Sequence, residues 1–227
     1  ERTLQYYYTT VAHMLSKMET PVRKITTEEI RTYLSEYQGN SHCTNVTIDN
    51  IRRNISSFFS WLEEEDYILK SPMRRIHKIK TKTVVKSVIS DEGIERLRDY
   101  CKESRDLAII DLLYSTGIRV GELVNLNKDD IDLEARECIV YGKGNKERRV
   151  YFDAKAKVHL KNYMEERNDD NKALFVTLDF PYARLKISGV EIRLRSLGRK
   201  LNLEKIHPHK FRRTMATRAI DKGMPIE

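Results

Sequence analysis

The residues best suited to chemistry lie in the heptapeptide His207-Pro208-His209-Lys210-Phe211-Arg212-Arg213. Pro208 favours the first turn of a helix, because its missing N–H group has no helical partner there. His209 and Arg212, three residues apart, would then share one face of that turn. Free backbone N–H groups and the helix dipole favour an anion at this position. The pattern indicates a phosphate site; the alternative is an ordinary solvated basic start of a helix.

Two other segments carry side chains of the same kind. Arg119 follows Gly117 by two residues, at the predicted start of a helix, where Glu122 at i+3 could orient it. Lys143 lies between two glycines in the predicted turn of a β-hairpin. Arginine offers a bidentate fork to phosphate oxygens, and a lysine with a pKa lowered by neighbouring cations can protonate a leaving alkoxide. With the histidine and arginine above, this is the set needed to stabilise a pentavalent phosphorus.

The distribution of charge favours a polyanionic partner. The net charge is +8 and the isoelectric point is about 9.3. Residues 181–213 alone carry a surplus of eight positive charges, so the rest of the chain sums to about zero. A second basic run, residues 74–86, contains no acidic residue. Two such clusters are typical of a protein that binds nucleic acid, although ordinary solubilising charge is the alternative.

Several classes of protein are disfavoured by composition. No apolar run approaches the length of about 20 residues that a membrane span needs, and the N-terminal residues do not form a secretory signal. Cys43, Cys101 and Cys138 are odd in number and far apart. They predict free thiols in a reducing cytoplasm, with no metal site. The sequence begins without a methionine, so we expect a fragment or a processed chain.

The first part of the chain reads as a helical domain over residues 1–75. Apolar spacing predicts an amphipathic helix over residues 3–18, whose apolar face would carry Leu4, Tyr8, Val11, Leu15 and Met18. A capping box at Thr26 predicts the start of a second helix, and Thr44 starts a third.

Residues 76–88 are basic and lack apolar periodicity, so they predict an extended linker. Such a positively charged strap suits a clamp around a rod-like polyanion, although an ordinary surface linker would look the same.

A second domain is predicted over residues 89–227. Ser90 caps its first helix. Its helices are expected near residues 91–102, 104–115, 120–126, 155–167 and 188–201, and its strands at 137–141, 148–152 and 173–177. The fold class is therefore mainly α with a small antiparallel β-sheet.

Three motifs in this domain stand in a recognisable order. They are Ser115-Thr116-Gly117-Ile118-Arg119-Val120-Gly121-Glu122-Leu123, then Gly142-Lys143-Gly144-Asn145-Lys146-Glu147-Arg148, then His209-Lys210-Phe211-Arg212. Together they resemble a tyrosine recombinase of the phage-integrase family, most similar to its Xer-like members. The resemblance covers nearly the whole chain. It implies a helical, SAM-like core-binding domain and a catalytic domain that close as a C-shaped clamp on duplex DNA.

The resemblance also implies roles for the matching residues. Arg119 and Arg212 would grip the scissile phosphate, Lys143 would protonate the 5′-hydroxyl leaving group, and His209 would assist proton transfer at the nucleophile. A tyrosine would then form a 3′-phosphotyrosyl bond that a second strand can rejoin, with neither metal nor cofactor.

The same resemblance implies a cytoplasmic DNA recombinase or integrase of a phage or mobile element, acting as a homo-tetramer on double-stranded DNA and not at a membrane. The residues expected to contact DNA are Arg52, Arg53, Arg74, Arg75, Lys78, Lys80, Arg184 and Lys186.

Two departures from the family pattern stand out. All twelve tyrosines precede Arg212, whereas the family's nucleophilic tyrosine follows that motif by several helical turns. We therefore expect that this sequence lacks the C-terminal nucleophile segment and that the fragment alone is inactive. Arg213 also stands where many relatives have a histidine.

Two other functions compete with a recombinase. A non-catalytic DNA-binding protein could keep the clamp without the chemistry, but mere binding does not need all four phosphate-directed residues. An unrelated phosphatase or nuclease is disfavoured, because no carboxylate cluster with metal-ligand spacing accompanies the basic residues.

Overall fold

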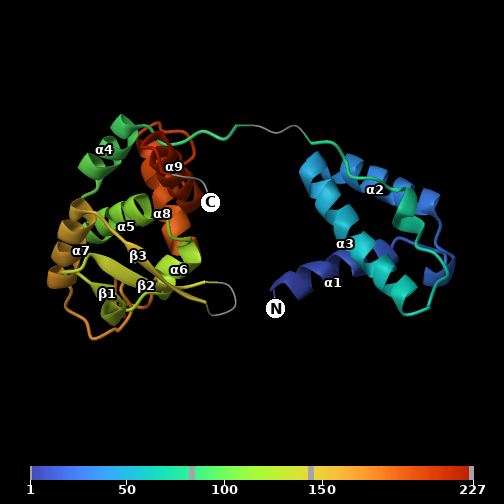
Figure 1. Ribbon diagram of the computed structural model, residues 1–227, viewed down its shortest axis with the longest axis horizontal. Helices are drawn as coiled ribbons and strands as arrows, with labels where there is room; N and C mark the ends of the chain where they lie inside the picture. The colour runs from blue at the N-terminus through green and yellow to red at the C-terminus, as the bar shows by residue number, and fades with distance from the viewer. Residues whose placement is uncertain (1, 82–84, 143–145, 225–227) are drawn as a thin grey trace. The chain divides into compact units, whose positions relative to one another are not determined.

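The computed structural model describes residues 2–81, 85–142 and 146–224. The chain divides into two compact units, unit 1 with residues 1–85 and unit 2 with residues 86–227 (Figure 1). Both are built mainly from helices, and unit 2 also contains a three-stranded antiparallel sheet, which confirms the predicted fold class. Within the described ranges, every helix is too short or too polar to cross a membrane.

Unit 1 is a small helical bundle. Its elements are α1 (Arg2–Leu15), a 3₁₀ turn η1 (Val22–Lys24), α2 (Thr27–Ser41), α3 (Asn45–Glu64) and a 3₁₀ turn η2 (Pro72–Arg75). Its core consists of Met14, Ile25, Ile30, Tyr33, Leu34, Ile48, Ile51, Ile55, Phe59, Leu62 and Met73.

The starts of two helices in unit 1 follow from their capping residues. At α2, the Thr26 hydroxyl accepts a hydrogen bond from the backbone N–H of Glu29, whose carboxylate accepts one from the backbone N–H of Thr26 at 2.7 Å. At α3, the Thr44 hydroxyl accepts from the backbone N–H of Thr47. Each cap satisfies N–H groups that have no partner within the helix, as the sequence predicted.

The predicted inward face of α1 is wrong in its first two turns. Leu4 and Tyr8 are exposed, at 75% and 70% of their surface. The helix joins the core only from Thr10, whose hydroxyl accepts a hydrogen bond from the buried Asn54 of α3 at 3.2 Å. Periodicity predicts that a helix forms, but it does not show how much of its length is covered by neighbours.

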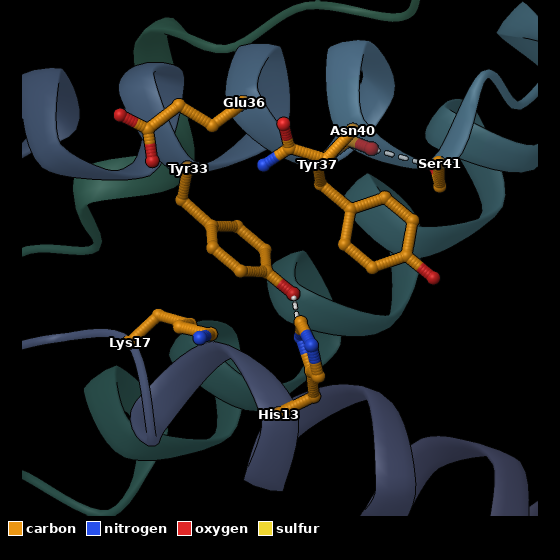
Figure 2. Close-up of a pocket in the computed structure, with 7 residues that line it drawn as sticks. All are labelled: His13, Lys17, Tyr33, Glu36, Tyr37, Asn40 and Ser41. Carbon is orange, nitrogen blue, oxygen red and sulfur yellow. Dashed lines mark hydrogen bonds between the residues drawn. The ribbon is translucent and has the colours of Figure 1, made fainter.

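A pocket lies between α1 and α2, with a volume of about 480 Å³ (Figure 2). A hydrogen bond of 2.8 Å between Nδ1 of His13 and the hydroxyl of Tyr33 joins the two helices across it. Burial, and secondarily the neighbouring Tyr37, raises the pKa of Tyr33 to about 12, so this phenol stays neutral. The pocket contains none of the predicted site residues.

Unit 2 surrounds one buried helix with other helices and a sheet. Its helices are α4 (Asp91–Tyr100), α5 (Ser104–Thr116), α6 (Val120–Asn125), α7 (Ala154–Glu166), α8 (Ile187–Lys200) and α9 (Pro208–Asp221). A 3₁₀ turn (Lys128–Asp130) leads into the strands β1 (Ile131–Asp132), β2 (Glu137–Tyr141) and β3 (Glu147–Tyr151), which pair in the order β1-β2-β3.

Helix α5 forms the centre of unit 2, in contact with both α7 and α9 (Figure 1). Ala108, Ile110, Leu112 and Leu113 are fully buried on it. Each buried aliphatic side chain larger than alanine contributes about 1.5–3 kcal/mol of hydrophobic stabilisation. The predicted burial of this helix is therefore confirmed, and its C-terminal end is held firmly in place.

The predicted strand at residues 173–177 does not form. Only isolated bridges join Asn127 to Ala173 and Val176 to Arg184. The guanidinium of Arg167 donates to the carbonyls of Ala173 and Leu174, at 2.6 and 2.9 Å. These carbonyls are therefore bonded to a side chain instead of a neighbouring strand. Strand β1 has only two residues, too few for its alternation to be recognised in the sequence.

The last residues of the predicted linker are attached to unit 2. The backbone N–H of Ile89 donates to the buried hydroxyl of Thr214 at 2.9 Å, and Nη1 of Arg213 donates to the carbonyl of Ser87 at 2.7 Å. Ser90 then caps α4, as predicted, by accepting from the backbone N–H of Gly93. The contact of Ser87, in the predicted linker, and that of Ile89, the first residue of the predicted second domain, are both made to α9.

Gly117 forms the turn between α5 and α6. It ends α5 in the left-handed region, with φ of +60°, where residues with a Cβ are strained. A Cβ there would also lie 2.4 Å from the terminal methyl carbon of Met215 on α9.

We expect Gly117→Ala to lower the free energy of unfolding of unit 2 by about 1–2 kcal/mol, because of this backbone strain. Gly121→Ala is the matched control: Gly121 lies within α6, and its added Cβ would meet only Ile187 at 4.0 Å. Urea denaturation should show a loss for the first variant and no loss for the second. Equal stability of the two variants would contradict this account of the turn.

Candidate active site

The turn that Gly117 makes brings two predicted site residues together. Arg119 is the residue immediately before α6. Arg212, from the second turn of α9, donates a hydrogen bond from Nη1 to the carbonyl oxygen of Gly117. Arg212, far from Arg119 in the sequence, is therefore bonded to the turn that leads into Arg119.

The carboxylate of Glu122 orients Arg119. Its Oε2 accepts the backbone N–H of Arg119 at 2.8 Å, and its Oε1 accepts Nη1 of the same residue at 3.0 Å. The side chain of Glu122 is only 5% exposed, whereas that of Arg119 is 54% exposed. The guanidinium is thus held at one edge and open to solvent over the rest, as a ligand for an anion must be.

A second arginine binds the same carboxylate. Nη1 and Nη2 of Arg148, on β3, donate to Oε1 and Oε2 of Glu122 at 2.8 and 2.7 Å. Burial opposes the ionisation of Glu122, but the hydrogen bonds from Arg148 and Arg119 outweigh it and lower its pKa to about 2. Glu122 is therefore an anion at every physiological pH.

The end of β2 that leads into the β2–β3 loop lies beside this ion pair. A Cβ on Gly142 would lie 3.5 Å from Nη1 of Arg148 and 3.9 Å from Oε1 of Glu122. The backbone N–H of Gly142 donates to the carbonyl of Lys146 at 2.8 Å, which closes the loop. Lys143, the predicted general acid, lies outside the described residues.

The heptapeptide starts α9, with Pro208 in its first turn as predicted. His209 is exposed, one turn before Arg212. Lys210 points the other way: it is buried, and its Nζ donates to the carboxylate of Glu204 at 3.1 Å. Only part of the basic heptapeptide is therefore available to a ligand.

His207, just before α9, is partly buried among positively charged residues, which changes its pKa. Burial, followed by the positive charge of Arg213 and its neighbours, lowers the pKa of His207 below its ordinary value of 6.5. It is neutral at pH 7.

The residues predicted to contact DNA fall into two groups. Those exposed to solvent are Arg53, Arg74, Arg75, Lys78, Lys80 and Lys186. Among these, Arg74 forms an ion pair with Glu63.

Arg52 and Arg184 instead hold protein groups. Arg52 is 14% exposed and bonds to Asp49 at 2.8 Å, and Asp49 also accepts the backbone N–H of Ile79. Arg184 donates to the carbonyls of Val124 and Leu126 at 2.8 and 3.0 Å, at the end of α6. Sequence patterns show that a side chain is basic, but not that a buried partner already occupies it.

Two arginines make contacts that no local sequence pattern predicts. Arg148 stands in the second motif, but its partner Glu122 lies on α6, and only the folded chain brings β3 against that helix. Arg213 had no assigned role, and the structure shows it bonded to Ser87.

Comparisons with known proteins agree with this architecture. The model of the phage integrase family matches residues 87–227, and that of the phage integrase N-terminal SAM-like domain matches residues 1–69. The chain belongs to the phage integrase family.

Individual relatives are tyrosine recombinases. The chain is 31% identical to the tyrosine recombinase XerC of Staphylococcus aureus (strain bovine RF122 / ET3-1), over 98% of this chain and 78% of the relative. Against the crystal structure of XerA recombinase it has 28% identity and a TM-score of 0.57, covering 98% of this chain and 79% of the other. The Tn1549 transposon integrase, solved with a circular intermediate DNA, has a similar fold, with a TM-score of 0.81 and 17% identity over 99% of this chain and 83% of that one.

The Glu122 ion pair predicts a pH dependence of stability. The pKa of this carboxyl is 4.5 when unperturbed and about 2 in the folded protein. Its stabilising contribution is therefore complete above about pH 4.5 and is lost as the pH falls toward 2. Glu122→Gln should lower the free energy of unfolding by roughly 2–3 kcal/mol at pH 7, and about half of that difference should be gone by about pH 3. Urea denaturation across this pH range measures it, and a difference that does not change with pH would contradict the prediction.

Proposed function

We propose that this protein is a site-specific DNA recombinase that cuts and rejoins duplex DNA through a 3′-phosphotyrosyl intermediate, in the service of a phage or another mobile element. The observation that carries the proposal is that Arg212 is bonded to the turn that leads into Arg119, while Arg119 is held by a buried carboxylate and open to solvent. Membership of the phage integrase family and the resemblance to XerC support it.

In this proposal, Arg119 and Arg212 bind the scissile phosphate and stabilise the charge that develops on its oxygens. His209, exposed one turn before Arg212, assists proton transfer at the attacking hydroxyl. Lys143, which follows Gly142 in the sequence and lies outside the described residues, protonates the 5′-hydroxyl leaving group. The phosphotyrosyl ester keeps the energy of the broken bond, so a second strand can rejoin without another energy source.

The proposed partner is double-stranded DNA, bound by a homo-tetramer in the cytoplasm. The Tn1549 integrase, which shares this fold, was solved with DNA. Residues 1–75 act as the core-binding domain, 76–88 as a basic linker and 89–227 as the catalytic domain. The exposed cations Arg53, Arg75, Lys78, Lys80 and Lys186 are proposed to contact the phosphate backbone.

Binding should depend steeply on salt, because neutralising phosphates releases counterions. We expect the double variant Arg75→Glu/Lys78→Glu to bind all duplex sequences more weakly, with a slope of log K against log salt reduced by about 2. Both side chains are exposed. Lys161→Glu is the control: this lysine is 59% exposed on α7 and is not among the proposed contacts. Fluorescence anisotropy at several salt concentrations provides the measurement, and a slope unchanged by the double variant would exclude these residues from the interface.

The covalent step needs a tyrosine in line with the leaving oxygen. All twelve tyrosines precede Arg212, so we expect the 227-residue chain to bind DNA without forming a covalent adduct. The same protein extended by a family-type nucleophile segment should form a protein–DNA ester on a nicked suicide substrate, visible by denaturing electrophoresis. Arg212→Gln in the extended protein should abolish that adduct. An adduct from the 227-residue chain would show that an upstream tyrosine is the nucleophile and would overturn this assignment.

A further inference from the structure

Three charged side chains meet at the first turn of α6. The carboxylate of Glu122 is bound by Arg119 and Arg148, which together leave a net charge of +1. Oε1 accepts one N–H from each guanidinium, and Oε2 accepts the second N–H of Arg148 together with the backbone N–H of Arg119. Each oxygen thus has two donors.

The two arginines use this carboxylate differently. Arg148 places both arms of its fork on it, and its side chain is 36% exposed. Arg119 gives it one arm and is 54% exposed. A bidentate arginine–carboxylate pair is the strongest arrangement of these groups. The negative charge of Glu122 is therefore matched mainly by Arg148, and the uncompensated positive charge lies on the open side of Arg119.

Without Arg148, the same carboxylate would face Arg119 alone. The pair would then be neutral, and an arginine already neutralised at 3.0 Å attracts a second anion weakly. Glu122 could still hold Arg119 in place, but it would also neutralise the positive charge of Arg119. Arg119 can therefore be oriented by Glu122 and still attract an anion only if a second cation binds the same carboxylate.

We propose that Arg148 is a positioning residue that neutralises Glu122, so that Arg119 is oriented by the carboxylate while its charge remains free for a phosphate group. The inference rests on the proposed function for the identity of that phosphate as DNA. The simpler alternative is that Arg148 only fastens the β2–β3 hairpin to α6.

Arg149 provides a matched control. It is the next residue on β3, so its side chain points to the opposite face of the strand. It is 59% exposed and pairs with Glu137 at 3.1 Å, not with Glu122. Arg149→Gln removes the same charge from the same strand without affecting the contact at α6.

The test uses inorganic phosphate as the probe, titrated into the isotope-labelled protein. The Nε–Hε resonance of Arg119, assigned by its loss in Arg119→Lys, reports binding. Arg148→Gln should weaken phosphate binding at this resonance by about tenfold or more, equal to ~1.4 kcal/mol. Arg149→Gln should leave it within about twofold, a change of only ~0.4 kcal/mol.

The double variant Glu122→Gln/Arg148→Gln separates charge balance from mechanical support. It restores the net charge of +1 at the site, so it should regain most of the phosphate affinity that Arg148→Gln loses. A double variant as weak as Arg148→Gln would overturn the proposal and leave Arg148 as a fastening of the hairpin.

A further variant guards against misfolding. Arg148→Lys keeps the charge but not the fork, and it should retain most of the phosphate affinity; a loss as large as that of Arg148→Gln would also overturn the proposal.

DNA cleavage by the extended protein is the second arm of the test. If phosphate binding follows the expected order while the extended protein does not cleave DNA at all, charge balance at Arg119 is established and the proposed function is the part that fails.

Discussion

The geometry of unit 2 depends on the hydrogen bonds that the buried carboxylate of Glu122 accepts. A carboxylate that is only 5% exposed is costly to bury unless its oxygens are fully hydrogen-bonded. Here the donors come from the turn before α6 and from strand β3, so the helix, the turn and the hairpin fix one another. Arg212 adds α9 to the same assembly through the carbonyl of Gly117. A displacement of the turn or of the hairpin would leave the buried carboxylate without part of its donors.

Buried charges also set the rotation of α5, whose hydrophobic surface alone would tolerate several orientations. Asp111, fully buried, pairs with Arg98 of α4 at 2.6 Å and with His159 of α7. The ring of Tyr114 is in contact with two guanidinium groups, those of Arg98 on α4 and Arg218 on α9, whose carbons are 5.4 and 5.0 Å from the ring centre. Directional contacts on several sides thus orient α5, and with it the turn that presents Arg119.

The sequence was a good guide wherever a local rule decides the structure. The caps at Thr26, Thr44 and Ser90 begin helices where predicted, and Pro208 lies in the first turn of α9. It was a poor guide where a distant partner decides. The strand expected at residues 173–177 is replaced by carbonyls bound to a guanidinium, which no local pattern encodes.

The same distinction applies to the candidate site. The identity of Arg119 and Arg212 as phosphate ligands could be proposed from residue type and spacing, and the structure brings them to one turn. Arg148 was overlooked because its importance comes from a contact between elements separated by more than twenty residues. Arg52 and Arg184 show the converse: their type predicts DNA contacts, and the protein groups that they bind are visible only in three dimensions.

The attachment of Ser87 and Ile89 to α9 determines where the chain can be divided. Unit 2 expressed from Ser90 onward would leave the buried hydroxyl of Thr214 without the N–H group from which it accepts, and Arg213 without its carbonyl partner. Domain exchange with a relative meets the same constraint, because Ser87 and Ile89 must travel with the helix they bind. The natural cut therefore lies upstream of Lys86, where unit 2 begins.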